Sequence, residues 1–149
     1  MNQQSQLNKS IETLQLRIVE LENREKELLI QLQQNLSLQS MVLDALPINV
    51  FLEDPAGRTL FANKQACLSN GKKLEELVGK TVFDFFPEHI AKMNREIDLE
   101  VWQSRSLITK EVMVGFQGQE SYMYTGKTII HPPESNEEFL LGFGWDITE

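Results

Sequence analysis

Residues 46–63 read LPINVFLEDPAGRTLFAN and have the pattern of a tight β-hairpin. The apolar run 48–53 favours one strand, and the run 59–62 favours a second strand that returns beside it. Between them, Asp54 can hydrogen-bond the backbone of its own turn, Pro55 presets φ, and Gly57 lets the backbone close. The stretch therefore predicts a strand–turn–strand unit that opens a β-sheet.

A block of helices is predicted after this hairpin. Asn63 stands where a helix N-cap is expected, ahead of a short helix over residues 64–68 that Gly71 ends. A second short helix is expected at residues 73–78, and residues 83–86 form a short apolar segment.

A longer helix is predicted to begin with Pro87 at its first position, and Glu88 is favourable near the positive end of such a helix. Apolar residues recur at helical spacing and predict a buried stripe that consists of Ile90, Met93, Ile97 and Val101. The other faces carry charged residues that we expect to be exposed, namely Lys92, Arg95, Glu96 and Asp98.

Three strand-like runs follow. They cover residues 107–116, 120–131 and 139–148, and polar loops at 117–119 and 132–138 separate them. Two strands, several helices and then three strands predict an α+β fold, in which an antiparallel sheet carries the helices on one face.

The first forty residues have a different pattern. Residues 7–46 contain neither Gly nor Pro and predict a long helix. Apolar residues alternate in three- and four-residue steps, with one glutamate in the series: Leu7, Ile11, Leu14, Ile18, Leu21, Glu25, Leu28 and Leu32. We call this series the seam. Isoleucine at position a and leucine at position d favour a parallel two-stranded coiled coil, so we expect a homodimer.

We therefore expect residues 1–40 to form a dimerisation helix and residues 41–149 to form the globular domain. After Leu32 the apolar stripe shifts, because Asn35 and Gln39 occupy the next seam positions. Such a phase change alters supercoiling locally. Two interpretations stay open and are compatible: the stripe turns to pack on the globular domain, or the shift acts as a joint in signal transmission.

Composition limits the classes of partner and compartment. The 14 basic and 22 acidic residues give a net charge of -8, and no basic patch is evident, so we expect no nucleic-acid partner. The single cysteine, Cys67, excludes an intrachain disulfide and favours a reducing compartment, hence the cytoplasm. The sequence shows no apolar run long enough for a membrane span and no signal peptide.

Residues 41–149 resemble the PAS family of bacterial signal-transduction proteins. The resemblance is carried by LP at 46–47, by DPAGR at 54–58 with FAN at 61–63, by VGK at 78–80, by FFP at 85–87 and by GFGWDITE at 142–149. It implies a five-stranded antiparallel PAS sheet with helices on one face, often with a small-molecule pocket between the sheet and the long helix.

The resemblance also implies a route for the signal. In relatives the Asp-Ile-Thr element joins the last strand to an output helix that leads to a histidine kinase, a cyclic-dinucleotide enzyme or another effector. Asp146 and Thr148 are the matching residues here, and Trp145 stands where relatives often have Arg or another polar residue. These three residues are the predicted output junction.

Two functions stay open. The chain is either a sensory module that couples a signal or small ligand to an effector outside this chain, as in two-component systems, or a ligand-free scaffold for dimerisation and conformational transmission. For the first, the candidate pocket residues are Met93, Ile97, Tyr122, Tyr124, Gly142, Phe143 and Gly144, because the two glycines leave room on one strand face. A filled core made by the same residues is the competing interpretation.

Cofactor chemistry is disfavoured by the residues present. His89 lies earlier than the position where haem-binding relatives place their ligand, Asn94 occupies that neighbourhood, and His131 ends a strand, so both histidines are expected on the surface. Cys67 lacks the Asn-Cys-Arg motif of photoactive flavin domains and is expected to be a buried small hydrophobe. Zinc-ligand spacing, a phosphate loop and a nucleophile motif are all missing, so we expect no enzyme activity in this chain.

Replacing Glu25 with isoleucine tests the coiled-coil interpretation. A glutamate at position a costs stability because like charges meet across the seam. We expect Glu25→Ile to raise the free energy of unfolding by about 1–2 kcal/mol in thermal melts followed by circular dichroism. Glu12→Ile, off the seam, is the control, and an unchanged melting temperature for Glu25→Ile would contradict the seam.

Overall fold

The structure is a computed structural model that describes residues 2–114 and 120–148. It divides into two compact units, Met1–Met41 and Val42–Glu149. Three predicted features fall outside the described residues: the end of the strand at Phe116, the loop at 117–119, and Glu149 after the output junction.

The N-terminal helix α1 spans Gln3–Ala45 and is 43 residues long. It is continuous through Asn35, where the apolar stripe changes phase, so the shift does not interrupt the backbone. At about 1.5 Å per residue, the helix is roughly 65 Å long. None of its residues is buried, and the apolar seam side chains are 44% to 62% exposed. The long helix is confirmed, whereas its parallel pairing with a second copy stays a prediction.

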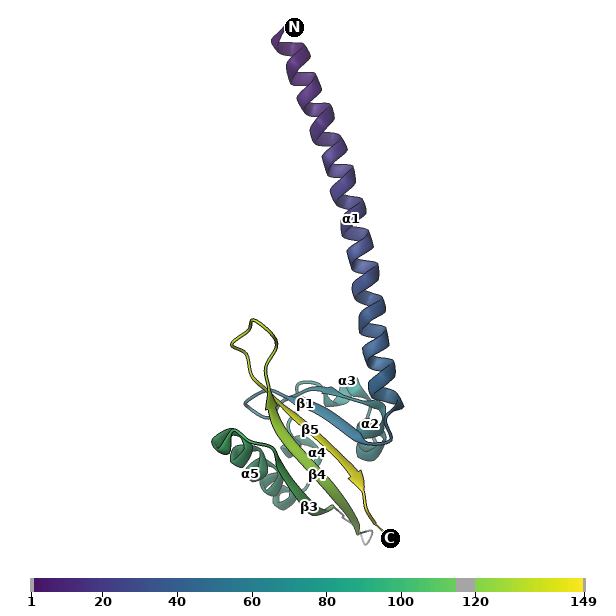
Figure 1. The fold of residues 1–149 in the computed structure, drawn as a ribbon. Coiled ribbons are helices and arrows are strands. Elements are labelled where there is room, and N and C mark those ends of the chain that lie inside the picture. Colours follow the sequence, from purple (N-terminus) through teal and green to yellow (C-terminus); the bar gives the residue numbers. More distant parts are fainter. Residues whose placement is uncertain (1, 115–119, 149) are drawn as a thin grey trace. The chain divides into compact units, whose positions relative to one another are not determined.

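The globular unit is an antiparallel five-stranded sheet in the order β2-β1-β5-β4-β3, with helices on one side of it (Figure 1). Its elements are β1 (Asn49–Glu53), β2 (Thr59–Ala62), α2 (Lys64–Asn70), α3 (Leu74–Leu77), α4 (Val82–Phe85), α5 (Glu88–Ser104), β3 (Ile108–Val114), β4 (Ser121–Ile130) and β5 (Phe139–Asp146). The predicted α+β class and helix placement are confirmed. Residues 83–85 of the apolar segment lie in the short helix α4 and Phe86 is its C-cap, and Pro87 is the N-cap of α5 rather than its first residue.

The hairpin turn forms as its residues predict. Asp54 Oδ1 accepts hydrogen bonds from the backbone N–H groups of Ala56 at 3.0 Å and Arg58 at 2.9 Å. Gly57 has φ +85°, a backbone conformation that residues with a Cβ atom rarely adopt. The turn brings β2 alongside β1, and the last strand β5 then pairs with the other edge of β1.

Asn63 connects the start of the sheet to the helices. Its side chain is fully buried and caps α2 by accepting from the Ala66 N–H at 3.0 Å, as predicted. The same oxygen accepts from the Val50 N–H at 3.0 Å, and the amide nitrogen donates to the carbonyl groups of Leu43 and Ile48, both at 2.9 Å. All four hydrogen-bonding positions of one side chain are therefore used, and they join the chain before β1, β1 itself and α2.

A buried ion pair joins α5 to the sheet. Lys127 Nζ of β4 lies 2.5 Å from Asp98 Oδ1 of α5, and the two side chains are 5% and 1% exposed. The prediction that Asp98 lies on an exposed face of the helix is wrong. Asp98 follows Ile97 on the buried side of α5, and burial is tolerated because Lys127 supplies the opposite charge.

Glu53 of β1 lies beside this pair and is only 4% exposed. Its pKa is raised to about 8, first by burial, then by the nearby negative charge of Asp98, while Lys127 and Arg95 oppose the shift. Among the described residues, no N–H or O–H group donates to Glu53 Oε2. The carboxyl groups of Glu53 and Asp98 are within hydrogen-bond reach, and they can bond only when one of them carries a proton. We therefore take Glu53 to be mostly protonated at neutral pH.

Replacing Asn63 with alanine tests its role as the link between sheet and helices. The change leaves the buried N–H groups of Val50 and Ala66 without acceptors. We expect Asn63→Ala to lower the free energy of unfolding by about 3 kcal/mol in urea titrations. Asn136→Ala, in an exposed loop, is the control, and equal stability of the two variants would contradict this role.

The buried Glu53 carboxyl predicts a pH dependence of stability. Unfolded, Glu53 ionises near pH 4.5, whereas in the folded chain it ionises near pH 8. Between these values the folded state holds a proton that the unfolded state has released, so the contribution of Glu53 to stability is fully present below pH 4.5 and is lost as the pH rises to 8. The slope from this one group is at most about 1.4 kcal/mol per pH unit.

Glu53→Gln removes the ionisation and keeps the size of the side chain. We expect urea unfolding of this variant to show a flatter stability profile between about pH 5 and about pH 8 than the wild type. Glu96→Gln, on the exposed side of α5, should keep the wild-type slope. A wild-type slope in Glu53→Gln would show that Glu53 does not ionise at the raised value.

Candidate functional site

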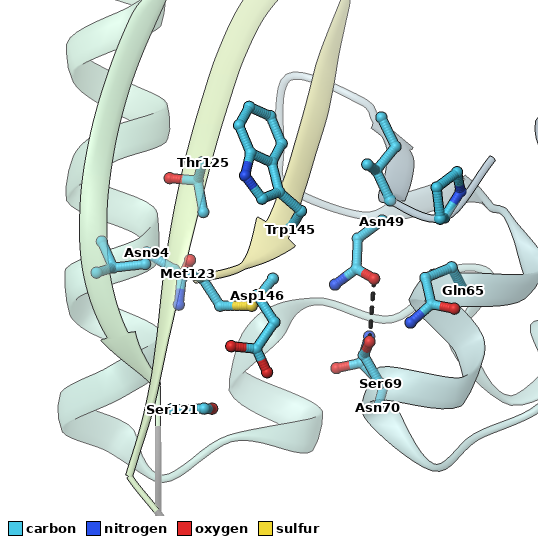
Figure 2. Close-up of a pocket in the computed structure, with 13 residues that line it drawn as sticks. Asn49, Gln65, Ser69, Asn70, Asn94, Ser121, Met123, Thr125, Trp145 and Asp146 are labelled. Atoms are coloured by element: carbon cyan, nitrogen blue, oxygen red, sulfur yellow. Dashed lines mark hydrogen bonds between the residues drawn. The ribbon is translucent and has the colours of Figure 1, made fainter. Parts of the chain in front are cut away.

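An open cleft of about 880 Å³ lies on the helix-bearing side of the sheet, where α2, α5 and the strands meet (Figure 2). It is lined by Pro47, Ile48 and Asn49 at the start of β1, by Gln65, Ser69 and Asn70 of α2, by Asn94 of α5, by Val112 of β3, by Ser121, Met123 and Thr125 of β4, and by Trp145 and Asp146 of β5. We call it the amide cleft, because four of these side chains are carboxamides. Its volume lies in the range of small-molecule sites.

The carboxamides are held by bonds that use only part of their capacity. Ser69 Oγ donates to Asn49 Oδ1 at 3.0 Å, a bond drawn in Figure 2. The amide nitrogens of Asn70 and Asn94 donate to backbone carbonyls one turn earlier, at 2.9 Å and 3.1 Å. Within the described part of the chain, the other polar group of the Asn49, Asn70 and Asn94 amides makes no hydrogen bond to a residue, so the cleft offers both donors and acceptors to a bound molecule.

A smaller cavity of about 110 Å³ adjoins the amide cleft, since Asn49 and Asn70 line both. We call it the deep cavity. Its wall is largely apolar and aromatic, with Phe51 of β1 and Phe85 of α4 among its residues. The buried carboxyl group of Glu53 also lines it. Glu53 is the ionisable residue among the described residues of this wall.

The output junction forms one wall of the amide cleft. Trp145 and Asp146 are both among its lining residues, and in Figure 2 their side chains extend in opposite directions from β5. The Asp146 side chain lies on the cleft face, whereas the Trp145 ring packs against Tyr124 and Phe143 on the opposite face. Asp146 Oδ1 accepts from the Thr148 N–H at 2.7 Å, and Thr148 Oγ1 accepts from the Tyr122 N–H at 2.8 Å. Hydrogen bonds from the side chain and then the backbone of Thr148 hold the pKa of Asp146 below its usual value. These bonds extend the pairing of β4 with the chain beyond β5.

The predicted pocket residues do not come together as one pocket. Gly142 and Gly144 lie on the helix-bearing face, where an added Cβ at Gly142 would collide with the Phe51 ring. Phe143 lies on the opposite face and covers Gly126. Side chains alternate between faces along a strand, so residues 142 and 143 cannot share one pocket wall.

The two tyrosines also lie away from the cleft. Tyr124 is paired with Trp145, with ring centroids 4.9 Å apart, and Tyr122 is exposed. On α5, Ile97 is buried and Met93 is half-buried, but neither is among the described residues that line the amide cleft. The polar neighbour of Met93, Asn94, lines it instead. Whether any of these residues contacts a ligand stays a prediction.

The candidate cofactor residues are placed as follows. His89 and His131 are both exposed. Cys67 is half-buried against Ala62, Ala66 and Leu77, and burial raises the pKa of its thiol. Within residues 2–114 and 120–148, no group of three or more His, Cys, Asp or Glu side chains is arranged to hold a metal ion. Over the same ranges, no helix combines the length and the apolar character that crossing a membrane requires.

Sequence reasoning missed Asn49 and Glu53, which line the two cavities from β1. The available signal was their spacing, since Asn49, Phe51 and Glu53 alternate onto one face of the strand. Val50 and Leu52 place apolar residues on the other face as well. Periodicity alone therefore did not show which face the helices would cover.

Comparison with known proteins identifies the fold. The sequence profile of the PAS fold family matches residues 43–149. The PAS domain of BvgS from Bordetella pertussis superposes with a TM-score of 0.65 at 21% identity, over 78% of this chain and 88% of that one. VqmA from Vibrio cholerae, solved in complex with a ligand and DNA, superposes with a TM-score of 0.66 at 19% identity, over 74% of this chain and 50% of that one.

One curated relative is an uncharacterized protein, y4lL, of Sinorhizobium fredii. It is 28% identical over 111 residues, which are 72% of this chain but only 13% of that protein. The identities to the solved structures are low, so those likenesses speak for the fold alone. The family profile covers well over half of the chain, and the chain therefore belongs to the PAS fold family.

Proposed function

We propose that this chain is the sensory module of a signal-transduction protein, in which a small ligand in the amide cleft alters the output junction. PAS relatives are signal-sensing modules, which supports this class of function. The observation that carries the proposal is the shared wall: Asp146 of the output junction lines the same cleft as the carboxamides of α2 and α5, whereas the Trp145 ring beside it packs on the opposite face of the sheet. A ligand there would touch the junction directly, with no relay through the core.

The junction is suited to respond, because few interactions hold it. Asp146 and Thr148 are exposed, and the segment after β5 is held by the bonds of Thr148 with Asp146 and Tyr122 and by the bond from the Ile147 N–H to the Tyr122 carbonyl at 2.8 Å. A ligand that shifts Asp146 changes the end of the β4–β5 pairing. The direction of the chain beyond residue 148 would change with it.

The proposed output is a histidine kinase or cyclic-dinucleotide enzyme outside this chain, in the cytoplasm. Dimerisation through the α1 seam would bring two such modules together. The exposure of every apolar seam side chain supports this part of the proposal, because a second helix would remove them from water. Enzyme activity is assigned to the effector and not to this chain.

The alternative is a scaffold that dimerises and transmits conformation without a ligand. The exposed seam favours it equally, since the seam requires no occupied cleft. Binding of a ligand in the amide cleft would support the sensory function, and an amide cleft that binds no ligand would support the scaffold.

A ligand screen tests the sensory function. In thermal-shift measurements with a library of small metabolites, we expect at least one compound to raise the melting temperature of the full chain. Asn94→Leu removes a polar group from the cleft wall without enlarging the cleft, so it should abolish most of that shift. Glu96→Leu, exposed on the same helix, is the control. A screen in which no compound shifts the wild type would favour the scaffold.

A further inference from the structure

We propose that the ligand of this chain carries a small protonated nitrogen group, an alkylammonium, amidinium or guanidinium, and that this group enters the deep cavity and pairs with the Glu53 carboxylate. The proposal rests on the proposed sensory function and names the chemical class of the ligand. The polar remainder of the ligand would lie among the carboxamides of the adjoining amide cleft.

The lining charges favour a cation. Among the described residues of the two cavity walls, the charged side chains are Glu53 and Asp146, and no Lys, Arg or His lines either cavity. An anionic ligand would therefore contact no cationic side chain in the described walls, and the nearby Lys127 is already paired with Asp98. Burying an unpaired anion beside a buried carboxyl group would be costly.

The buried Glu53 carboxyl lacks a donor that a cationic nitrogen would supply. Glu53 is only 4% exposed, and its Oε2 accepts no hydrogen bond from the described residues. Without a ligand, a proton on Glu53 hydrogen-bonds its carboxyl group to Asp98 and so stands in for the missing donor. The neighbouring cations do not fill it: Lys127 is engaged by Asp98 at 2.5 Å, and Arg95 donates to the Pro55 carbonyl at 3.0 Å through Nη2. Arg95 Nη1 is buried but makes no hydrogen bond to Glu53 or to any other described residue.

The deep cavity limits the size and character of the group. A volume of 110 Å³ equals the liquid volume of roughly four waters, which suits a group of about five non-hydrogen atoms. The rings of Phe51, Phe85 and Phe86 line it. Aromatic faces attract a desolvated cation. Lys127 Nζ already lies 5.6 Å from the centroid of the Phe51 ring, so Phe85 and Phe86 are the aromatic residues that we assign to an ammonium carried on a short apolar stem.

Binding would exchange one proton for one cation. Glu53 would release its proton to solvent as the ligand nitrogen, which keeps its own proton, takes its place. The total charge of Glu53, Asp98, Lys127, Arg95 and the cavity contents is then the same before and after binding. The charged groups that face Glu53 are Asp98 and Arg95 from α5 and Lys127 from β4.

The exchange is measurable with n-butylammonium as the probe. Titration calorimetry of the full chain at pH 7, in buffers of different ionisation enthalpy, should report release of about 0.9 proton per amine bound, the protonated fraction expected for a group that ionises near pH 8. The affinity should rise about tenfold per unit from about pH 6 to about pH 8 and then level off. Butyrate, which is similar in size and negatively charged, should not bind.

Glu53→Gln should weaken n-butylammonium binding at least about tenfold and abolish proton release, whereas Glu96→Gln should match the wild type. The wild-type pH profile does not depend on how well the variant folds. Absence of butylammonium binding, or binding without proton release, overturns the cation assignment. If another class of compound then binds the amide cleft, the sensory function stands; if nothing binds, it fails as well.

Discussion

Asp98 and Lys127 form their ion pair at 2.5 Å where both side chains are almost completely withdrawn from water. Removing two charges from water is expensive, and their attraction repays that cost only when the geometry is close and the pair is intact. The pair therefore fixes where α5 lies on the sheet, because a shift of the helix would leave a buried charge unpaired. The amide cleft depends on this placement, since Asn94 lines it from the same helix.

The same pair explains the state of Glu53. A carboxyl group buried next to Asp98 cannot ionise easily, because its charge would lose hydration and face another negative charge. Lys127 offsets only part of this cost, since it already pairs with Asp98. The domain thus keeps a neutral acid at the end of an aromatic cavity. Such a group is costly to retain for stability alone, which makes a role in binding a reasonable hypothesis.

Asn63 organises the opposite side of the domain by a different principle. It is uncharged, so its burial requires only that its amide makes its hydrogen bonds, and it makes four. These bonds hold the start of β1, which carries Asn49 into the cleft, against α2, which carries Asn70. The two sides of the cleft are therefore positioned by two buried polar side chains, one charged and one neutral.

The sequence by itself determined what depends on residues close together in the chain. The Asp54 turn, the Asn63 cap, the Gly71 helix end and the long helix α1 were predicted, because short-range hydrogen bonds and backbone preferences decide each of them. The order of strands and helices was enough to predict the sheet class. The family resemblance located the output junction at Asp146 and Thr148, a role that stays a proposal.

Only the tertiary structure decided which side chains share a space. Asp98 and Lys127 are 29 positions apart, and Glu53 lies on a third element, so no local pattern joins them. The pocket was predicted from apolar residues at helix and strand spacing. The structure places some of those residues on one face of the sheet, some on the other face, and some in the core. The cleft is lined instead mainly by polar residues of α2, α5 and the strands β1, β4 and β5. A site of this kind depends on which face of each strand the helices cover. Packing contacts between residues far apart in the sequence determine that face.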